Sequence, residues 1–221
     1  MLDLWRYATD HRQEMANLTA EHLLLVAISV GGAILIGVPL GVWATRSGRV
    51  EKPVMGLANV VQTIPSLAMF GFLIPLPLFG GVGASTAIVA LTLYAILPIV
   101  RNTFAGIRGT DPTLREAARG MGMTDRQLLL RVELPLSAGI ILAGVRVATV
   151  TSVGIATIAA AIGAGGLGVY IFQGLAMVND TVILAGALPA ALLALLADGL
   201  LGVMEKKLTL ATPAATRDRD R

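Results

Sequence analysis

The chain has 221 residues, of which 55% are hydrophobic, 5% aromatic and 14% charged, and its mean hydropathy is +0.77. Soluble domains carry about 25% charged residues, so this composition excludes a soluble enzyme, a disordered chain and a nucleic-acid-binding domain. The net charge is only +3 although the isoelectric point is near 9.7, so the placement of the basic residues matters more than their number. Cysteine is absent, which excludes a disulfide, a thiol nucleophile and a cysteine–metal site.

Long charge-free runs predict membrane-spanning helices in the first half of the chain. A helix needs about 20 apolar residues to cross the hydrocarbon core of a bilayer. The run 23–45 predicts one span. The run 53–100 is too long for one helix, and the prolines and glycines at 75–83 divide it into a second span near 54–74 and a third near 84–104.

The charged loop over 108–133 has the residue pattern of two short helices. Asp111 followed by Pro112 is an N-cap with proline at the first helical position. Apolar residues then recur at helical spacing and form a stripe along one side of the first helix: Leu114, Ala117, Ala118 and Met121. Gly120 and Gly122 end this helix.

A second short helix is expected to begin at Thr124, with Gln127 at the capping-box position, and to end where Leu134 and Pro135 start the next span. The two helices would lie outside the lipid with a bend at Gly122. Such an element can insert into a cleft on a soluble partner. Alternatively, it rests on lipid headgroups or on its own bundle, and the residue pattern alone leaves both open.

The second half of the chain predicts two more spans. Apolar sequence over 134–162, interrupted only by Arg146, forms the fourth span. Glycines end it at 163–168, and the apolar piece 167–178 is too short to cross, so a re-entrant or interfacial helix is expected there. The last span covers about 181–203. Backbone polar groups in lipid need internal partners, so the fold class is all-α, a polytopic bundle of five transmembrane helices.

The basic residues predict the topology and the domains. Lys and Arg are enriched in cytoplasmic loops, and most of the 17 lie in the loops 46–52 and 101–133 and in the C-terminal tail. Five spans place all three segments on one side, taken as the cytoplasm. We therefore expect a periplasmic arm over 1–21, a single transmembrane domain over 22–204 and a disordered cytoplasmic tail over 205–221, in a cell (inner) membrane protein.

The charged loop resembles the EAA loop of ABC importer permeases. That pattern is Glu-Ala-Ala, three residues, Gly, nine residues, Ile, one residue, Leu-Pro. The matching residues are Glu116, Ala117, Ala118, Gly122, Val132, Leu134 and Pro135, with Val for Ile as the one departure. The resemblance implies that this loop forms the coupling helices that seat in a groove of a cytoplasmic ATPase. The coupling positions carried over from the motif would be Glu116, Ala117, Ala118 and Gly122, and the apolar stripe adds Leu114 and Met121.

Three further segments resemble the branch of this family that imports osmoprotectants, namely glycine betaine, proline betaine, choline and carnitine. They are QTIPSLA at 62–68, IGAGGLG at 162–168 and DGL at 198–200. Related amino-acid and methionine importers have similar runs, so a permease of that kind is the alternative. A proton-coupled carrier is less favoured, because Asp180 and Asp198 lie near span ends rather than mid-membrane.

The resemblance also implies the assembly and its energy source. The fold would be that of type I ABC importer permeases, and the partners would be a second permease, two ATPase subunits and an extracytoplasmic substrate-binding protein. The second permease could be a copy of this chain or a sister chain. The sequence has no G-x-x-x-x-G-K-[ST] motif. We therefore expect a non-catalytic subunit that binds no cofactor, with ATP and Mg on a separate ATPase.

Polar residues inside the predicted spans are candidates for a translocation pathway. On the second span they are spaced to form one stripe: Asn59, Gln62, Thr63 and Ser66. Their counterparts on the fourth span are Thr149 and Ser152. The alternative is hydrogen bonding between helices, a common role of such residues in membranes.

Arg146 is the one charge well within the fourth span, where a charge is costly. It could act as a gate or contact a substrate carboxylate. The alternatives are snorkelling toward the cytoplasmic side and an ion pair with a neighbouring chain. His11 and His22, with no cysteine, cannot form a metal site or a catalytic group, so no catalytic or metal residue is assigned.

Overall fold

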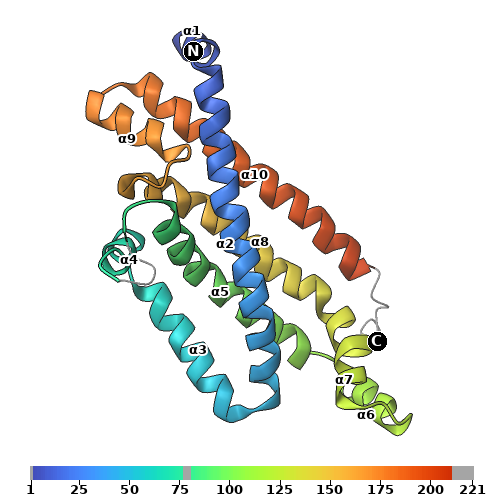
Figure 1. Cartoon of the computed structure of the whole chain (residues 1–221). Helices are drawn as coiled ribbons and strands as arrows, with labels where there is room; N and C mark the ends of the chain where they lie inside the picture. Colours follow the sequence, from blue (N-terminus) through green and yellow to red (C-terminus); the bar gives the residue numbers. More distant parts are fainter. Residues whose placement is uncertain (1, 77–80, 211–221) are drawn as a thin grey trace.

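The computed structural model describes residues 2–76 and 81–210, and every regular element within them is a helix (Figure 1). Four helices are long and apolar enough to cross a membrane. They are α2 (Arg12–Arg46), α5 (Ala84–Arg108), the continuous helix that contains α8 (Leu134–Ala159), and α10 (Asp180–Leu210). A bent pair, α3 (Gly48–Thr63) and α4 (Ser66–Leu73), makes a fifth if it counts as one span. The expected all-α bundle is confirmed.

Small residues let the central helices pack closely. Helix α2 lies against α5, α5 against α8, and α8 against α10. A Cβ added at Gly41 of α2 would lie 2.6 Å from the Cβ of Thr103 on α5, and one added at Gly144 of α8 would lie 2.6 Å from the Cβ of Asn102. Packing through glycine at such contacts is typical of helices in membranes, where dispersion contacts replace the hydrophobic effect.

The second span is broken, which corrects the expectation of one continuous helix over 54–74. Helices α3 and α4 meet at an angle of 103°. Pro65 has no N–H to continue the helix and disfavours the helical conformation of Ile64, whose backbone is extended (φ −75°, ψ 126°). The Tyr94 hydroxyl of α5 donates a hydrogen bond to the Ile64 carbonyl, which satisfies the backbone at the break.

The charged loop also differs from expectation in one respect. Helix α6 (Pro112–Gly120) is separate, but α7 (Asp125–Leu128) continues through a π-helical turn (Leu129–Glu133) directly into α8. The expected boundary at Leu134 and Pro135 is therefore wrong. In the π turn, the Leu134 N–H donates a hydrogen bond to the Leu129 carbonyl, five residues back. Pro135, which has no N–H to donate, therefore lies where the hydrogen-bond pattern changes from π-helical to α-helical.

The two ends of the bundle carry the remaining elements. Helix α1 (Leu2–Asp10) and the short apolar helix α9 (Gly168–Met177), expected at 167–178, lie at one end, and α6 and α7 lie at the other (Figure 1). Helix α10 continues past the expected span end at 203. The expectation of a disordered tail is therefore wrong for 205–210, and 211–221 lie outside the described residues.

Candidate coupling surface and translocation pathway

The α6–α7 hairpin (residues 111–128) begins each helix with the cap that the sequence predicts. The Asp111 carboxylate accepts a hydrogen bond of 2.8 Å from the Thr113 N–H, and Pro112 occupies the first turn. Thr124 and Gln127 form the reciprocal capping box, in which each side chain accepts a hydrogen bond from the other residue's backbone N–H. Both helix starts are therefore fixed by interactions within three residues.

The bend between the helices is a Schellman motif built on Gly122. The Gly122 N–H bonds the Arg119 carbonyl at 2.9 Å, and the Met123 N–H bonds the Ala118 carbonyl at 3.1 Å. The motif requires a left-handed residue at the position after the cap, and Gly122 has φ +81°. No atom lies within 4 Å of a Cβ added there. Glycine is thus required by backbone conformation and not by space.

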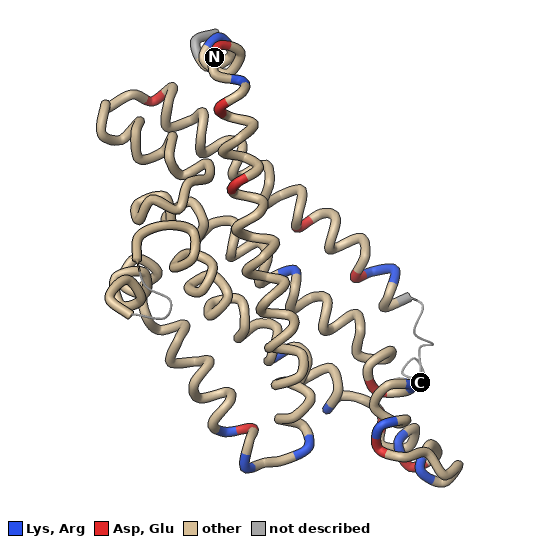
Figure 2. Tube along the Cα trace, in the orientation of Figure 1, with Lys and Arg blue, Asp and Glu red and all other residues tan. Residues whose placement is uncertain are grey.

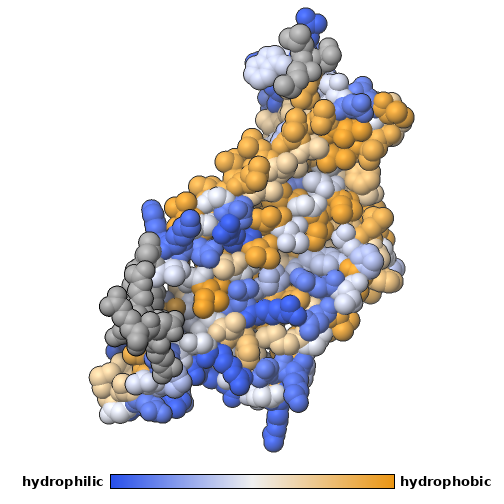
Figure 3. All heavy atoms as spheres, turned by 180° about the vertical axis from the view of Figure 1, so that it is seen from behind, coloured by the Kyte–Doolittle hydropathy of each residue, from blue (hydrophilic) through white to orange (hydrophobic). Residues whose placement is uncertain are grey.

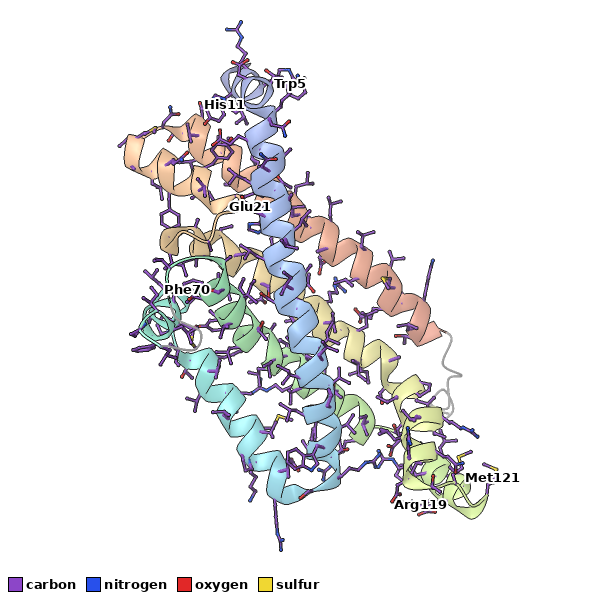
Figure 4. The ribbon with its side chains drawn as sticks, in the orientation of Figure 1. Trp5, His11, Glu21, Phe70, Arg119 and Met121 are labelled. Carbon is purple, nitrogen blue, oxygen red and sulfur yellow. The ribbon has the colours of Figure 1, made fainter. Side chains whose placement is uncertain are left out.

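Most of the expected coupling positions are exposed on the hairpin. Met121 is 72% exposed and Leu114 40%, and Glu116 and Ala117 are also exposed. Ala118 is the exception, because it is buried and supports the hairpin from inside. Figure 4 shows Met121 at the tip, pointing away from the bundle. The hairpin therefore presents an apolar stripe with Glu116 beside it, a surface suited to a protein groove.

Sequence reasoning missed the group that anchors this hairpin, the fully buried carboxylate of Glu133 in the π-helical turn. Arg46 at the end of α2 forms a bidentate ion pair with the Glu133 carboxylate. Arg115 of α6 approaches the same carboxylate at 3.2 Å and also donates to the Ile107 carbonyl of α5. Glu133 therefore joins α2, the hairpin and the start of α8. Its only sequence signal is an acidic residue directly before an apolar span.

Of the polar stripe expected on the second span, only two of the four residues face a common hollow. Gln62 and Ser66 line a hollow of about 550 Å³ between α3, α4, α5 and α8. The Gln62 amide donates to the Tyr94 carbonyl at 3.1 Å. Asn59 and Thr63 do not line this hollow: Asn59 accepts a hydrogen bond of 2.6 Å from Arg101, and Thr63 bonds a carbonyl of its own helix.

On α8 the hollow is lined by Thr151 and not by the two expected residues. The Thr149 hydroxyl donates to the Val145 carbonyl of its own helix at 2.8 Å. Ser152 is buried, and its hydroxyl has no hydrogen-bond partner in the described part of the chain. A spacing of three residues correctly puts Thr149 and Ser152 near each other, but it does not tell which side of the helix faces the hollow.

Arg146 pairs with two carboxylates of α10 in the same chain. Its guanidinium binds Asp198 with two hydrogen bonds of 2.6 and 2.8 Å and Glu205 with one of 3.2 Å. Pairs within the chain are not among the alternatives that the sequence suggests, and the role of Arg146 as a gate stays a prediction. The partners lie 52 and 59 residues further along the chain, so inspection of one helix could not find them.

These polar groups form one continuous surface that extends from α3 and α4 over α5 and α8 to α10. The hollow at Gln62 and a second one of about 350 Å³ at Arg146 share Val147 and Thr151 of α8. We call this surface the polar face. Its residues are Gln62, Ser66, Arg101, Asn102, Arg146, Thr151, Asp198 and Glu205. Seen from behind, hydrophilic atoms extend across the middle and lower part of the molecule between apolar regions (Figure 3).

The exposed surface of α2 is different in character. It carries large apolar side chains that suit contact with lipid: Leu23, Leu24, Ile28, Leu35 and Ile36. Charged groups are costly in hydrocarbon and normally face protein or water. The polar face is therefore suited to a partner chain or a wet path, and the α2 surface to the bilayer.

The glycine-rich turn after α8 (residues 163–168) lies at the end of the bundle opposite the hairpin. Gly163, Gly165 and Gly166 all have positive φ. The Glu21 carboxylate, labelled in Figure 4, accepts a hydrogen bond of 3.0 Å from the Gly166 N–H. A ring nitrogen of the buried His22 lies 3.2 Å from the Val153 carbonyl. Glu21 thus holds the turn that leads into α9, and the next residue, His22, ties α2 to α8.

A family model for the inner-membrane component of binding-protein-dependent transport systems matches residues 37–210. The chain belongs to this family. Family members are transport permease subunits that reside in the inner membrane, and the match includes the α6–α7 hairpin, the polar face and the glycine-rich turn. The resemblance seen in the charged loop is thereby confirmed.

Several relatives align with this chain over nearly its whole length. The carnitine transport permease protein OpuCB of Listeria monocytogenes is 47% identical over 90% of this chain and 89% of its own length. The osmoprotectant import permease protein OsmW of Salmonella typhimurium is 46% identical over 94% of this chain and 98% of its own length. A chain of the MetNI methionine ABC transporter, solved in an inward-facing conformation, has a TM-score of 0.78 and 26% identity over 86% of this chain and 93% of that one. The fold is therefore that of a type I ABC importer permease.

Proposed function

We propose that this chain is the permease subunit of an ABC importer that carries osmoprotectant quaternary amines into the cytoplasm. The substrate class is that of glycine betaine, proline betaine, choline and carnitine. The observation that carries the proposal is the 47% identity to a carnitine permease over 90% of the chain. A methionine or amino-acid substrate is the second candidate, supported by the lower, 26% identity to the methionine transporter chain.

The exposed stripe of the α6–α7 hairpin is the proposed contact with the ATPase. Leu114, Ala117 and Met121 would enter an apolar groove, and Glu116 would fix the register beside them. ATP and Mg would be bound by the ATPase, and this chain would be non-catalytic. Motion of the hairpin would reach the bundle through the Glu133 ion pairs, because they join α6 to α2 and to the start of α8.

The polar face is the proposed contact with a second permease and one wall of the pathway. Burial of Arg101, Arg146 and the α10 carboxylates against a partner chain would remove them from lipid. Gln62, Ser66 and Thr151 would then line the space between the two permeases. The partner would be a second copy of this chain or a sister permease.

The orientation proposed for the chain follows from charge. Blue basic residues gather at the end of the bundle that holds the α2–α3 turn and the hairpin (Figure 2). The positive-inside rule assigns this end to the cytoplasm. The N-terminus, α1, α9 and the glycine-rich turn would then lie on the outer side, where a substrate-binding protein delivers its cargo.

Uptake by cells that lack other osmoprotectant importers tests the proposal. Cells that express this chain with its ATPase and binding protein should accumulate labelled glycine betaine or carnitine at low external concentration. Matched cells whose chain carries Glu116→Lys should not. Accumulation of labelled methionine, with none of any quaternary amine, would favour the second candidate and reject the proposed substrate class.

A further inference from the structure

A cleft of about 780 Å³ opens between the end of α2 and the α6–α7 hairpin, apart from the polar face. Its wall on α2 is formed by Val38, Pro39, Val42 and Trp43. Leu129 and Leu134 form the opposite wall. Three arginines and Asp125 also line it: Arg46, Arg119 and Arg126. We call it the arginine cleft.

The cleft changes from apolar to basic along α2. Its lining residues on α2 run from Val38 to Arg46, which are eight positions apart and so about 12 Å apart along the helix. Trp43 lies between these ends and is 57% exposed. Tryptophan is enriched where the hydrocarbon core meets the headgroups. The wall therefore has the polarity of a phospholipid, with acyl chains at one end and a phosphate at the other.

The arginines retain positive charge for a ligand. Within the described part of the chain, no carboxylate lies within ion-pair distance of Arg126. Arg119 approaches Asp125 at 3.7 Å, and both side chains are more than half exposed, so this pair contributes little. Arg46 forms an ion pair with Glu133, which also pairs with Arg115. Arg119 and Arg126 thus face a single lining carboxylate, Asp125, and the cleft keeps a net positive charge.

We propose that the arginine cleft binds an anionic phospholipid, with its phosphate against Arg119 and Arg126 and its acyl chains against the α2 wall. Basic pockets between helices at a membrane surface bind anionic headgroups in this way. The lipid would touch both α2 and the hairpin, so it would brace the element that contacts the ATPase. The inference rests on the proposed topology, which places this end of the bundle at the cytoplasmic membrane surface.

Tryptophan fluorescence tests the proposal in the full-length chain. The chain has two tryptophans, so Trp5→Phe leaves Trp43 in the cleft as the single emitter. The protein is placed in phosphatidylcholine nanodiscs that contain increasing mole fractions of brominated phosphatidylglycerol or, in a matched series, of brominated phosphatidylcholine. Trp43 should be quenched at a several-fold lower mole fraction of the anionic lipid, and added salt should reduce this preference.

Matched charge removals separate a built site from general surface attraction. Arg126→Gln and Arg119→Gln should each raise the mole fraction of brominated phosphatidylglycerol needed for half-quenching by about fivefold, because each arginine near an anionic surface contributes about 1 kcal/mol. The control is Arg131→Gln, an equal charge change at an exposed residue of the same continuous helix that does not line the cleft. It should change the preference much less, because solvent screens a charge that does not contact the bound phosphate.

Three results would overturn the proposal. Equal quenching by the two lipids would show that the cleft does not select charge. Equal loss of preference in Arg131→Gln would show diffuse attraction to the surface. Shielding of Trp43 from both lipids when the ATPase is added would show that protein occupies the cleft. Because no transport is measured, a failure here is distinct from a failure of the proposed substrate class.

Discussion

Glu133 is a single carboxylate on which three elements depend. It is fully buried, while the arginines that flank it are partly exposed, with side chains 35% exposed for Arg46 and 26% for Arg115. Removal of one partner from a buried ion pair costs about 3–5 kcal/mol, because the remaining charge is left without a partner. Partial exposure of the arginines reduces this cost, so the lower part of that range is expected.

Glu133→Gln should therefore lower the thermal stability of the purified chain in detergent and reduce uptake. Glu51→Gln is the matched control, because Glu51 pairs with Arg108 at 3.1 Å on the surface, where such pairs are worth about 1 kcal/mol or less. A thermal-unfolding assay compares the two variants. Equal melting temperatures for the two variants would contradict the anchoring role of Glu133.

Gly122 gives a second prediction at this scale. A residue with a Cβ is destabilised by about 1–2 kcal/mol in the left-handed conformation, and asparagine tolerates it better than others. Uptake should therefore fall in the order glycine, asparagine, alanine, valine at position 122. Gly120→Ala, with no positive φ and open space around its Cβ, should transport normally. Normal uptake by Gly122→Val would show that the bend does not need this conformation.

At the scale of elements, helix α6 packs against the bundle on one side and is exposed on the other. Ala118 and Arg115 face the bundle, whereas the Glu116 side chain is exposed and makes no ion pair or hydrogen bond within the described part of the chain. Within residues 2–76 and 81–210, no side-chain interaction of Glu116 supports the fold. A change at this residue should therefore act on a partner and leave the bundle intact.

Glu116→Lys should abolish uptake while the chain still inserts in the membrane at normal abundance, and Glu116→Ala should reduce the amount of ATPase that co-purifies. Asp10→Ala, an exposed acid at the other end of the bundle, should leave co-purification unchanged. Immunoblots of membranes and of the purified complex measure both quantities. Unchanged recovery of the ATPase with Glu116→Ala would argue against a direct contact at this side chain.

Local patterns predicted these elements well, and long-range contacts account for what they missed. The caps at Asp111 and Thr124 and the bend at Gly122 depend on residues at most five positions apart, so the sequence reveals them directly. By contrast, Arg46 and Glu133 are 87 residues apart. Likewise, the sequence near Pro65 predicts a continuous span, because the Tyr94 hydroxyl that stabilises the break belongs to another helix.

At the scale of the whole molecule, the two long surfaces differ in what they can face. The polar face presents Thr151 and paired charges, and the α2 surface presents leucines such as Leu35, which is 77% exposed. The chain has no cysteine, so single-cysteine variants report on each surface without background. In the assembled transporter, water should therefore reach the polar face and lipid should cover α2.

Thr151→Cys should therefore react with a small hydrophilic thiol reagent in membranes at a rate at least about tenfold above that of Leu35→Cys, because lipid excludes the charged reagent from α2. Substrate should slow the reaction at position 151. Mass spectrometry of the labelled chain measures both rates. Faster labelling at position 35 than at position 151 would contradict the assignment of the pathway to the polar face.

The most direct test concerns the location of the α6–α7 hairpin. Met121→Cys at its tip and Val178→Cys, 89% exposed after α9, mark opposite ends of the bundle. With a membrane-impermeant thiol reagent, Met121→Cys should be labelled only in inside-out vesicles and should be protected when the ATPase is bound, whereas Val178→Cys should be labelled in intact cells. Labelling of Met121→Cys from outside, or no protection by the ATPase, would contradict the account.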